Sequence, residues 1–185
     1  MGTFFQSARK RSSPASVSAN STSAGLNEFG DYWHANKAGT PRAVAHFLSG
    51  KSLGGGIGWI GVVCGGDFLF QGHYGGGYGF SAGIRGNPKG TFDVTDPSLF
   101  WDLYVVSHET GHNFGSRHSH CYSPPVDNCY NAEAGCYSGA VSVPNGGGSI
   151  MSYCHLQPGG YSNINLWFGR TGFYGNQSER VPAAM

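Results

Sequence analysis

Three histidines within eleven residues constrain the fold of this chain more than any other feature. They lie in the segment His108-Glu109-Thr110-Gly111-His112-Asn113-Phe114-Gly115-Ser116-Arg117-His118. On a helix, His108 and His112 are one turn apart, so both imidazoles can reach a single ion. Gly115 permits a sharp turn of the backbone, which lets His118 approach that ion from the other side. The segment therefore predicts a helix that ends in a tight turn beside a metal site.

The number of ligands indicates the kind of metal site. Three neutral imidazoles leave a fourth position open for water, which is typical of a catalytic rather than a structural zinc site. We therefore predict one Zn²⁺ ion with His108, His112 and His118 as its ligands. Zinc lowers the pKa of its bound water to about 7, and Glu109 can take that proton and pass it to a leaving amine. The alternative is a pair of histidines on a helix surface, followed by an unrelated glycine. In that case the match at all five motif positions, His108, Glu109, His112, Gly115 and His118, would be a coincidence.

A helix is predicted from about Ser98 to Asn113 or Phe114, after the helix-start dipeptide Asp96-Pro97. One face of this helix is largely apolar and carries Leu103, Val106, Thr110 and Phe114. At about 100° per residue, the two histidines lie almost opposite that face. We therefore expect a core helix that buries its apolar face and turns the histidines toward a cleft.

Glycine makes up 32 of the 185 residues, and half of these glycines lie between Gly50 and Gly90. This stretch predicts tight turns around short strands. Within it, the run from Ile57 to Cys64 predicts a buried strand, and the run from Tyr78 to Ile84 predicts a half-exposed edge strand.

Upstream of the glycine-rich stretch, apolar residues recur at helical spacing on either side of Pro41. They are Leu26, Phe29, Tyr32, Trp33, Val44, Phe47 and Leu48. We therefore expect two helical pieces with a break at Pro41.

Length and patterning predict one domain between two tails. Residues 1–25 are polar and rich in serine, which predicts a disordered tail with no reason to pack. The catalytic domain is expected over residues 26–170, with an upper lobe over 26–118 and a lower lobe over 119–170. An irregular tail is expected over 171–185.

Charge and hydropathy exclude two classes of function. Eleven basic and ten acidic residues give a net charge of +1, and no basic stripe is interleaved with aromatic residues. Nucleic acid is therefore not an expected partner. No apolar run approaches the ~20 residues that a membrane-spanning helix needs, so no membrane span is expected.

Four of the five cysteines lie between Cys121 and Cys154. Two disulfides in so short a segment indicate an oxidising compartment, so the chain is expected to be secreted. The alternative is a cytosolic protein with reduced, buried thiols. Met1 to Gly25 lacks the apolar core of a signal peptide, so a signal would lie upstream, or export follows another route.

The other five histidines have no partner at ligand spacing, and we expect ordinary loop or surface residues. They are His34, His46, His73, His120 and His155. His120 alone is reserved as a possible exception, because it lies two residues from His118.

Taken together, the motifs resemble those of the metzincin metallopeptidases, and of adamalysin-type (reprolysin-like) members in particular. The resemblance rests on the long zinc motif, on the methionine turn Ser149-Ile150-Met151-Ser152-Tyr153, and on the run Gly56–Cys64, and it covers about residues 26–169. It implies an α+β zincin-like fold. A small twisted mixed sheet with the active-site helix would lie above an irregular, disulfide-linked lower lobe.

The same resemblance implies a function. It indicates a monomeric zinc metalloendopeptidase that hydrolyses peptide bonds through a zinc-bound water activated by Glu109. The protein or peptide substrate would be bound as an extended strand along the edge strand Tyr78 to Ile84. The alternative is a non-catalytic zinc-binding module or an inactive fragment of a metallopeptidase. Which peptide bond is cut depends on the irregular segment after His120, which the sequence does not resolve.

The methionine turn carries two expectations about the site. Met151 is expected beneath the three imidazoles as a hydrophobic floor rather than as a ligand. Tyr153 has two possible roles: its phenol hydrogen-bonds the tetrahedral intermediate, or the residue is a buried structural tyrosine.

For the cysteines we expect the pairs Cys121–Cys154 and Cys129–Cys136, with Cys64 left over, although four cysteines allow three pairings. Adamalysin-like domains begin with a strand, a helix and a second strand, and they end in a helix whose cysteine pairs with one at the place of Cys64. These N- and C-terminal elements are missing from the pattern here. Ser119 also stands where adamalysins have aspartate, and Met-Ser-Tyr is closer to serralysin and astacin turns. We therefore expect a fragment or a divergent form of the domain, with an incompletely covered sheet.

Overall fold

The computed structural model describes residues 18–86, 97–169 and 180–185. Its helices are α1 (Thr22–Lys37), α2 (Pro97–Asn113) and α3 (Arg180–Ala184), with 3-10 helices η1 (Ser119–Cys121), η2 (Cys154–Leu156) and η3 (Gly160–Asn163). Its strands are β1 (Ala45–Leu48), β2 (Gly56–Gly58), β3 (Phe68–Phe70), β4 (His73–Gly75) and β5 (Tyr78–Ser81). This α+β architecture, with two small sheets, is that of a metzincin-like domain, as predicted.

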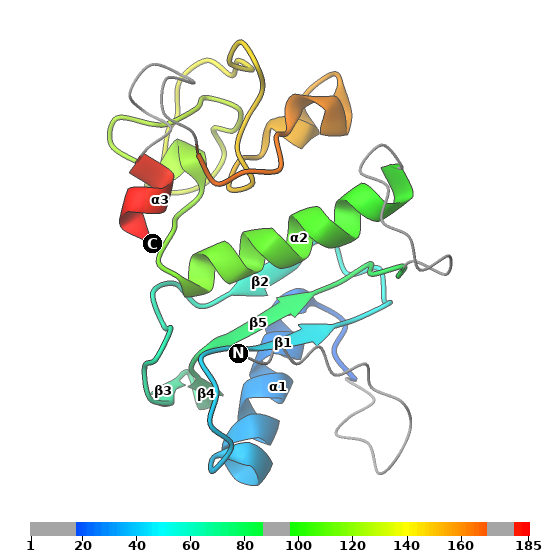
Figure 1. Cartoon of the computed structure of the whole chain (residues 1–185), viewed down its shortest axis with the longest axis vertical. Coiled ribbons are helices and arrows are strands. Elements are labelled where there is room, and N and C mark those ends of the chain that lie inside the picture. The colour runs from blue at the N-terminus through cyan, green and yellow to red at the C-terminus, as the bar shows by residue number, and fades with distance from the viewer. Residues whose placement is uncertain (1–17, 87–96, 170–179) are drawn as a thin grey trace.

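The main sheet has the strand order β1-β5-β2, with β1 parallel and β2 antiparallel to the central strand β5. In its register, Phe80 of β5 lies between Phe47 of β1 and Ile57 of β2. Strands β3 and β4 form a separate hairpin. Figure 1 shows α1 below this sheet, α2 above it, and the cysteine-bearing segment beyond α2. The helix α2 therefore has the sheet on one side and the irregular segment on the other.

The main core lies between α1 and the sheet. Tyr78 and Phe80 are fully buried, and the ring centroids of Phe47 and Phe80 are 5.3 Å apart. The Ser21 side chain accepts a hydrogen bond from the amide of Ala24 and so caps the start of α1. Burial of the aromatic face, rather than helix propensity, holds this helix against the sheet.

Glycines let α2 lie close to the opposite face of the sheet. A Cβ atom at Gly58 would lie 2.7 Å from the backbone oxygen of Glu109, and one at Gly79 would lie 2.7 Å from the His46 ring. A side chain at Gly58 would push the helix away from the strands, and one at Gly79 would meet the His46 ring of the neighbouring strand β1. The glycine-rich composition thus has a local purpose, which is to bring the histidine-bearing helix against the backbone of β2 and β5.

The predicted buried strand from Ile57 to Cys64 is wrong beyond Gly58. The chain leaves the sheet there because its amides bind the C-terminal end of α2 instead. The Gly61 amide donates to the His112 carbonyl at 2.9 Å, and the Val62 amide donates to the Asn113 carbonyl at 2.9 Å. These carbonyls have no partner within the helix, so the apolar run satisfies a helix end rather than a strand ladder.

The predicted edge strand from Tyr78 to Ile84 is also wrong. Strand β5 ends at Ser81, is buried at every residue, and is paired on both sides. Its weak alternation of small and large residues reflects two covered faces, with the aromatic rings toward α1 and glycine toward α2. The antiparallel strand β2 is the edge strand nearest α2.

The second helical piece predicted after Pro41 is a strand, β1, and not a helix. Four residues are too few for periodicity to separate the two structures, and pairing with β5 decides the outcome. The first piece is a helix, as expected.

Both predicted tails are wrong where the structure describes them. Ala19 is buried, and α1 begins at Thr22, inside the tail predicted over residues 1–25; residues 1–17 lie outside the described part of the chain. At the other end, α3 buries Val181 against Ile150 and Met151. Residues 170–179 and the predicted helix start Asp96 also lie outside the described residues.

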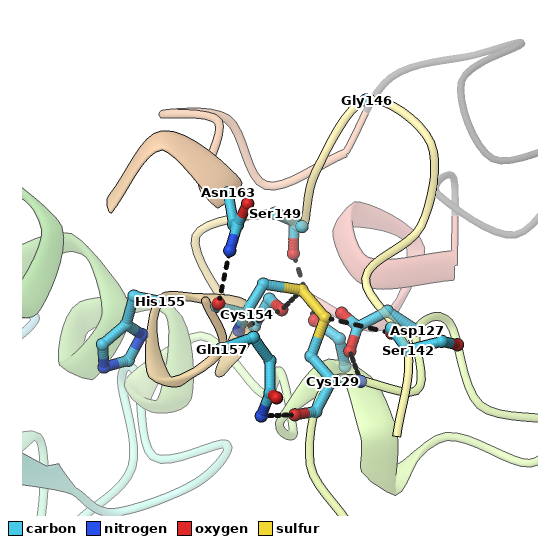
Figure 2. The surroundings of a disulfide bond; sticks show 12 residues. Asp127, Cys129, Ser142, Gly146, Ser149, Cys154, His155, Gln157 and Asn163 are labelled. Atoms are coloured by element: carbon cyan, nitrogen blue, oxygen red, sulfur yellow. Dashed lines mark hydrogen bonds between the residues drawn. A yellow bond between two sulfur atoms is a disulfide. The ribbon is translucent and has the colours of Figure 1, made fainter. Parts of the chain in front are cut away.

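The segment after α2 is held together by cross-links and hydrogen bonds. The disulfides are Cys121–Cys136 and Cys129–Cys154, so the predicted pairing is wrong, while Cys64 is free and exposed as expected. Figure 2 shows the second bridge, where Gln157 donates to the Cys129 carbonyl at 2.9 Å. Within the described residues, no helix is long and apolar enough to cross a membrane.

Candidate metal and catalytic site

The helix α2 ends at Asn113, as the sequence predicts, but it buries the face opposite to the expected one. His108, Glu109 and His112 are each no more than 5% exposed, whereas Phe114 is 41% exposed. The histidine face is buried because β2 and the methionine turn pack against it. The expected apolar face is less covered by other segments.

The turn after α2 brings His118 back toward the helix. Gly115 has a φ of 108°, a conformation that side chains disfavour, and its amide donates to the His112 carbonyl at 2.8 Å. Glycine at this position therefore closes the helix and reverses the chain, as the motif predicts.

Each of the three imidazoles is held through its Nδ1 atom. The Nδ1 of His108 lies 2.7 Å from the Ile150 carbonyl, and the Nδ1 of His112 lies 2.7 Å from the Ser116 carbonyl. The Nδ1 of His118 lies 2.7 Å from Oε2 of Glu133. Because these partners only accept, each Nδ1 carries the proton and each Nε2 presents a lone pair.

The three rings converge. Their ligand atoms lie within 4.8 Å of one another, and the Nε2 atoms of His112 and His118 are 3.1 Å apart. Tetrahedral zinc, with Zn–N bonds of about 2.0–2.1 Å, separates two ligand nitrogens by about 3.3 Å. The donor set and its spacing therefore fit a zinc ion held by His108, His112 and His118.

Burial keeps these rings in the form that binds a metal. Desolvation and the two neighbouring imidazoles lower the pKa of His108, and desolvation with the charge of His118 lowers the pKa of His112 to about 4. Desolvation also lowers the pKa of His118, although Glu133 opposes that shift. Neutral imidazoles at neutral pH leave their lone pairs free for an ion.

Glu109 follows His108 on α2 and lies against the edge strand β2. Its carboxylate packs under β2, where a Cβ atom at Gly56 would lie 2.5 Å from Oε1. Burial raises the pKa of this carboxyl well above its usual value. The neighbouring residue Asn113 fixes the helix to the strands, because its Nδ2 donates to the carbonyls of Trp59 and Tyr78 at 2.9 Å each.

The methionine turn supports the ligand side of α2. Met151 is fully buried, and its sulfur lies 2.6 Å from where a Cβ atom at Gly111 would be. The Met151 carbonyl accepts from the amide of Ser119 at 2.8 Å. The absence of a side chain at Gly111 therefore leaves room for the Met151 sulfur. The helix packs on this thioether one residue before His112.

Tyr153 extends from the same turn toward the ligands. Its hydroxyl lies 2.9 Å from Nε2 of His118, and its ring stacks on His108 with centroids 5.9 Å apart. Since His118 carries its proton on Nδ1, the phenol is the donor in this bond. The phenol therefore reaches the place where the three imidazoles converge, although the ring itself is largely buried.

Sequence reasoning missed Glu133 and misjudged His120. His120 is fully buried, against the expectation of a loop or surface residue, and its Nε2 lies 2.9 Å from the same Glu133 oxygen that binds His118. The two-residue spacing from His118 was the available signal. Nothing in the sequence brings Glu133 to these rings without the correct cysteine pairing.

The other four histidines lie apart from the metal ligands in different surroundings. His34 and His73 are partly exposed and bind Asp67 and Asp31, while His46 is largely buried against Ser81 and His155 against Tyr104.

Comparison with protein families gives a match over most of the chain. The reprolysin-type family model described as metallo-peptidase family M12 matches residues 3–168. The matched range contains all three histidines, Glu109 and the methionine turn. No curated protein matches the chain significantly.

Proposed function

The chain belongs to metallo-peptidase family M12, and on that premise we propose that it is a zinc-dependent endopeptidase with His108, His112 and His118 as the metal ligands. The observation that carries this proposal is the convergence of three neutral imidazoles beside a buried carboxylate. A structural zinc site would close the fourth position with another ligand, whereas among the described residues no fourth His, Cys, Asp or Glu joins these three histidines as a group.

Each side chain has a distinct role in this mechanism. Zinc, when bound, supplies a Lewis acid that lowers the pKa of water and polarises the scissile carbonyl. Glu109 accepts a proton from the attacking water on its carboxylate and passes it to the leaving amine. The Tyr153 hydroxyl binds Nε2 of His118 in this structure; with that nitrogen engaged by zinc, the phenol would be free to donate a hydrogen bond to the oxyanion that develops on the carbonyl.

We propose that the substrate pairs with β2 rather than with the segment from Tyr78 to Ile84, whose strand has both edges occupied. β2 has one partner among the described strands and lies directly over Glu109. An extended peptide added to its free edge would place a backbone carbonyl beside that carboxylate. Just before β2, a cavity of about 300 Å³ lined by Gly54, Gly55, Arg85, Trp101 and Tyr161 could take a substrate side chain.

Two disulfides in the segment after α2 support a secreted enzyme. Bridges of this kind persist in oxidising compartments and are rare in the cytosol. The proposed location is therefore extracellular.

Zinc content and hydrolysis measured on the same purified chain test the proposal. We expect one equivalent of zinc, cleavage of internal bonds in a peptide library, loss of cleavage on chelation and its return with added zinc. A chain that binds zinc and cleaves no member of the library would support the alternative of a non-catalytic zinc-binding module. His118→Ala is the matched variant, and it is expected to lose both the ion and the cleavage.

A further inference from the structure

We propose that Glu133 is a positioning residue for the ligand His118 and that His120 holds Glu133 in place, so that this pair raises the affinity of the site for zinc. The inference rests on the proposed function, because it takes His118 as a zinc ligand. It adds two residues that lie outside the zinc motif and come from the disulfide-linked segment.

One oxygen of Glu133 binds both histidines. Oε2 accepts from Nδ1 of His118 at 2.7 Å and lies 2.9 Å from Nε2 of His120. The two rings are parallel, with an interplanar angle of 9° and centroids 5.4 Å apart. The carboxylate therefore spans the ends of two stacked imidazoles.

His118 needs such a partner more than the other two ligands do. His108 and His112 lie on α2, where the helix backbone sets the direction of each side chain, and their Nδ1 atoms meet backbone carbonyls. His118 follows the turn at Gly115 and lies before η1, outside any helix. A carboxylate acceptor fixes the tautomer and the ring orientation of such a ligand, and it raises the basicity of the ligand nitrogen.

The surroundings of His120 fit the role of holding the carboxylate. The ring is fully buried and packs edge-to-face on Tyr130, with centroids 5.2 Å apart. Its Nδ1 has no hydrogen-bond partner among the described residues, so the bond that the buried ring makes is the one from Nε2 to Glu133. His120 therefore donates to the carboxylate and leaves the other lone pairs of Glu133 free for His118.

The fold brings Glu133 to this position through a cross-link. Cys121–Cys136 ties the loop that carries Glu133 to the segment just after His118. The Tyr137 amide also donates to the His120 carbonyl at 3.0 Å. The side chain of Glu133 is 35% exposed, so its replacement by glutamine leaves no buried unpaired charge behind.

Zinc affinity of the Glu133→Gln variant tests the inference. The dissociation constant is measured by competition with a chromophoric chelator, and we expect it to rise 10–100-fold, the range typical of a lost partner of a ligating histidine. Cobalt bound in place of zinc should show shifted absorption bands, because the field at one ligand changes. His120→Phe keeps a ring in the stack but removes the donor, and a smaller rise is expected. Glu28→Gln, an exposed carboxylate that binds Ser18, is the matched control and should leave the dissociation constant unchanged.

Three outcomes would contradict the inference. A Glu133→Gln variant with wild-type zinc affinity and an unchanged cobalt spectrum would remove Glu133 from the positioning role. A lower melting temperature of the metal-free variant, with unchanged affinity in its folded fraction, would make Glu133 a structural residue only. A wild-type chain that binds no zinc would contradict the proposed function and this inference together, which separates that failure from the other two.

Discussion

Single residues set the distance between the edge strand β2 and the Glu109 carboxylate. Gly56 and Gly58 have no side chains on the face toward α2, so Glu109 lies directly against the strand backbone. The buried carboxylate consequently has a raised pKa, and the neighbouring imidazoles have lowered ones. The protonation of the site thus depends on the missing side chains of the β2 glycines as well as on the side chains that α2 presents.

Adding one methyl group to β2 should disturb this arrangement. Gly56→Ala would place its Cβ atom 2.5 Å from Oε1 of Glu109, so one of the two has to move. We expect a loss of about 1–3 kcal/mol in the free energy of unfolding, the cost of overpacking a tight contact, together with reduced kcat. Chemical denaturation and peptide hydrolysis measure both effects. Gly39→Ala, where no atom lies within 4 Å of the added carbon, is the control and should change neither.

Replacing the carboxylate itself should separate catalysis from metal binding. Glu109→Gln keeps the shape of the side chain but removes the proton acceptor, and it removes no ligand. We expect kcat to fall by about 10²–10⁴-fold or more, with zinc content unchanged in metal analysis. Full activity in this variant would refute the mechanism.

His46 should make the metal-free chain sensitive to mild acid. Burial lowers its pKa from 6.5 to about 4, so the unfolded chain takes up the proton first as the pH falls. The stability contributed by the neutral ring is therefore present above pH 6.5 and is lost as the pH falls toward 4. At 1.36 kcal/mol per pKa unit, the loss is about 3 kcal/mol.

Denaturation of the chelated chain between pH 7 and pH 4 measures this loss in the wild type and in His46→Gln. The variant should show the shallower pH dependence, because the metal ligands titrate in both chains and cancel from the comparison. Equal slopes would mean that His46 is accessible to protons in the folded state.

At the scale of elements, α2 and its closing turn were predictable because their signals are local. The spacing of the histidines, the helix end at Asn113 and the left-handed Gly115 all follow from residues within one or two turns of each other. Strand β1 could not be told from a helix because Val44, Phe47 and Leu48 fit either period. The central place of β5 is not predictable from its own residues because its neighbours come from distant segments. The pairing of Glu133 with His120 is not predictable for the same reason, since the Cys121–Cys136 bridge and the bond from the Tyr137 amide to the His120 carbonyl bring the two segments together.

The disulfides should contribute most of the stability of the irregular segment, which has little regular structure. Replacing both Cys129 and Cys154 by serine frees a loop of 25 residues, and the entropy of closing such a loop is worth about 3.5 kcal/mol. We expect a fall of this order in the free energy of unfolding, measured by chemical denaturation. Cys64→Ser, which removes a free thiol and no bridge, is the matched control. A double variant as stable as the wild type would show that hydrogen bonds alone hold this segment.

At the scale of the whole molecule, α2 belongs to both halves of the structure. One side of the helix packs on the sheet through Glu109 and Asn113, and the other rests on the methionine turn. The short helix α3 adds Val181 to the packing against Ile150 and Met151 of this turn. Both halves therefore have to be folded before the three imidazoles can converge.

The exposed thiol of Cys64 should determine the behaviour of the molecule in oxidising buffer. With no internal partner, it is free to form a bridge between two copies. Non-reducing electrophoresis after mild oxidation should show a dimer in the wild type and a monomer in Cys64→Ser. Persistence of the dimer in that variant would point instead to exchange of one of the internal bridges.

The backbone after β2 is bound to the end of α2 by main-chain amides. Gly61 and Val62 donate to the last carbonyls of the helix, and Asn113 binds back to two strand carbonyls. The bonds made by the Val62 and Val63 amides do not depend on the side chains of these residues, whereas Gly61 has a φ of 68°, a conformation that side chains disfavour. Substitutions at Val62 and Val63 can therefore change this surface, while β2 stays in register with Glu109. In the proposed mechanism, the character of the surface and the point of cleavage can thus vary independently.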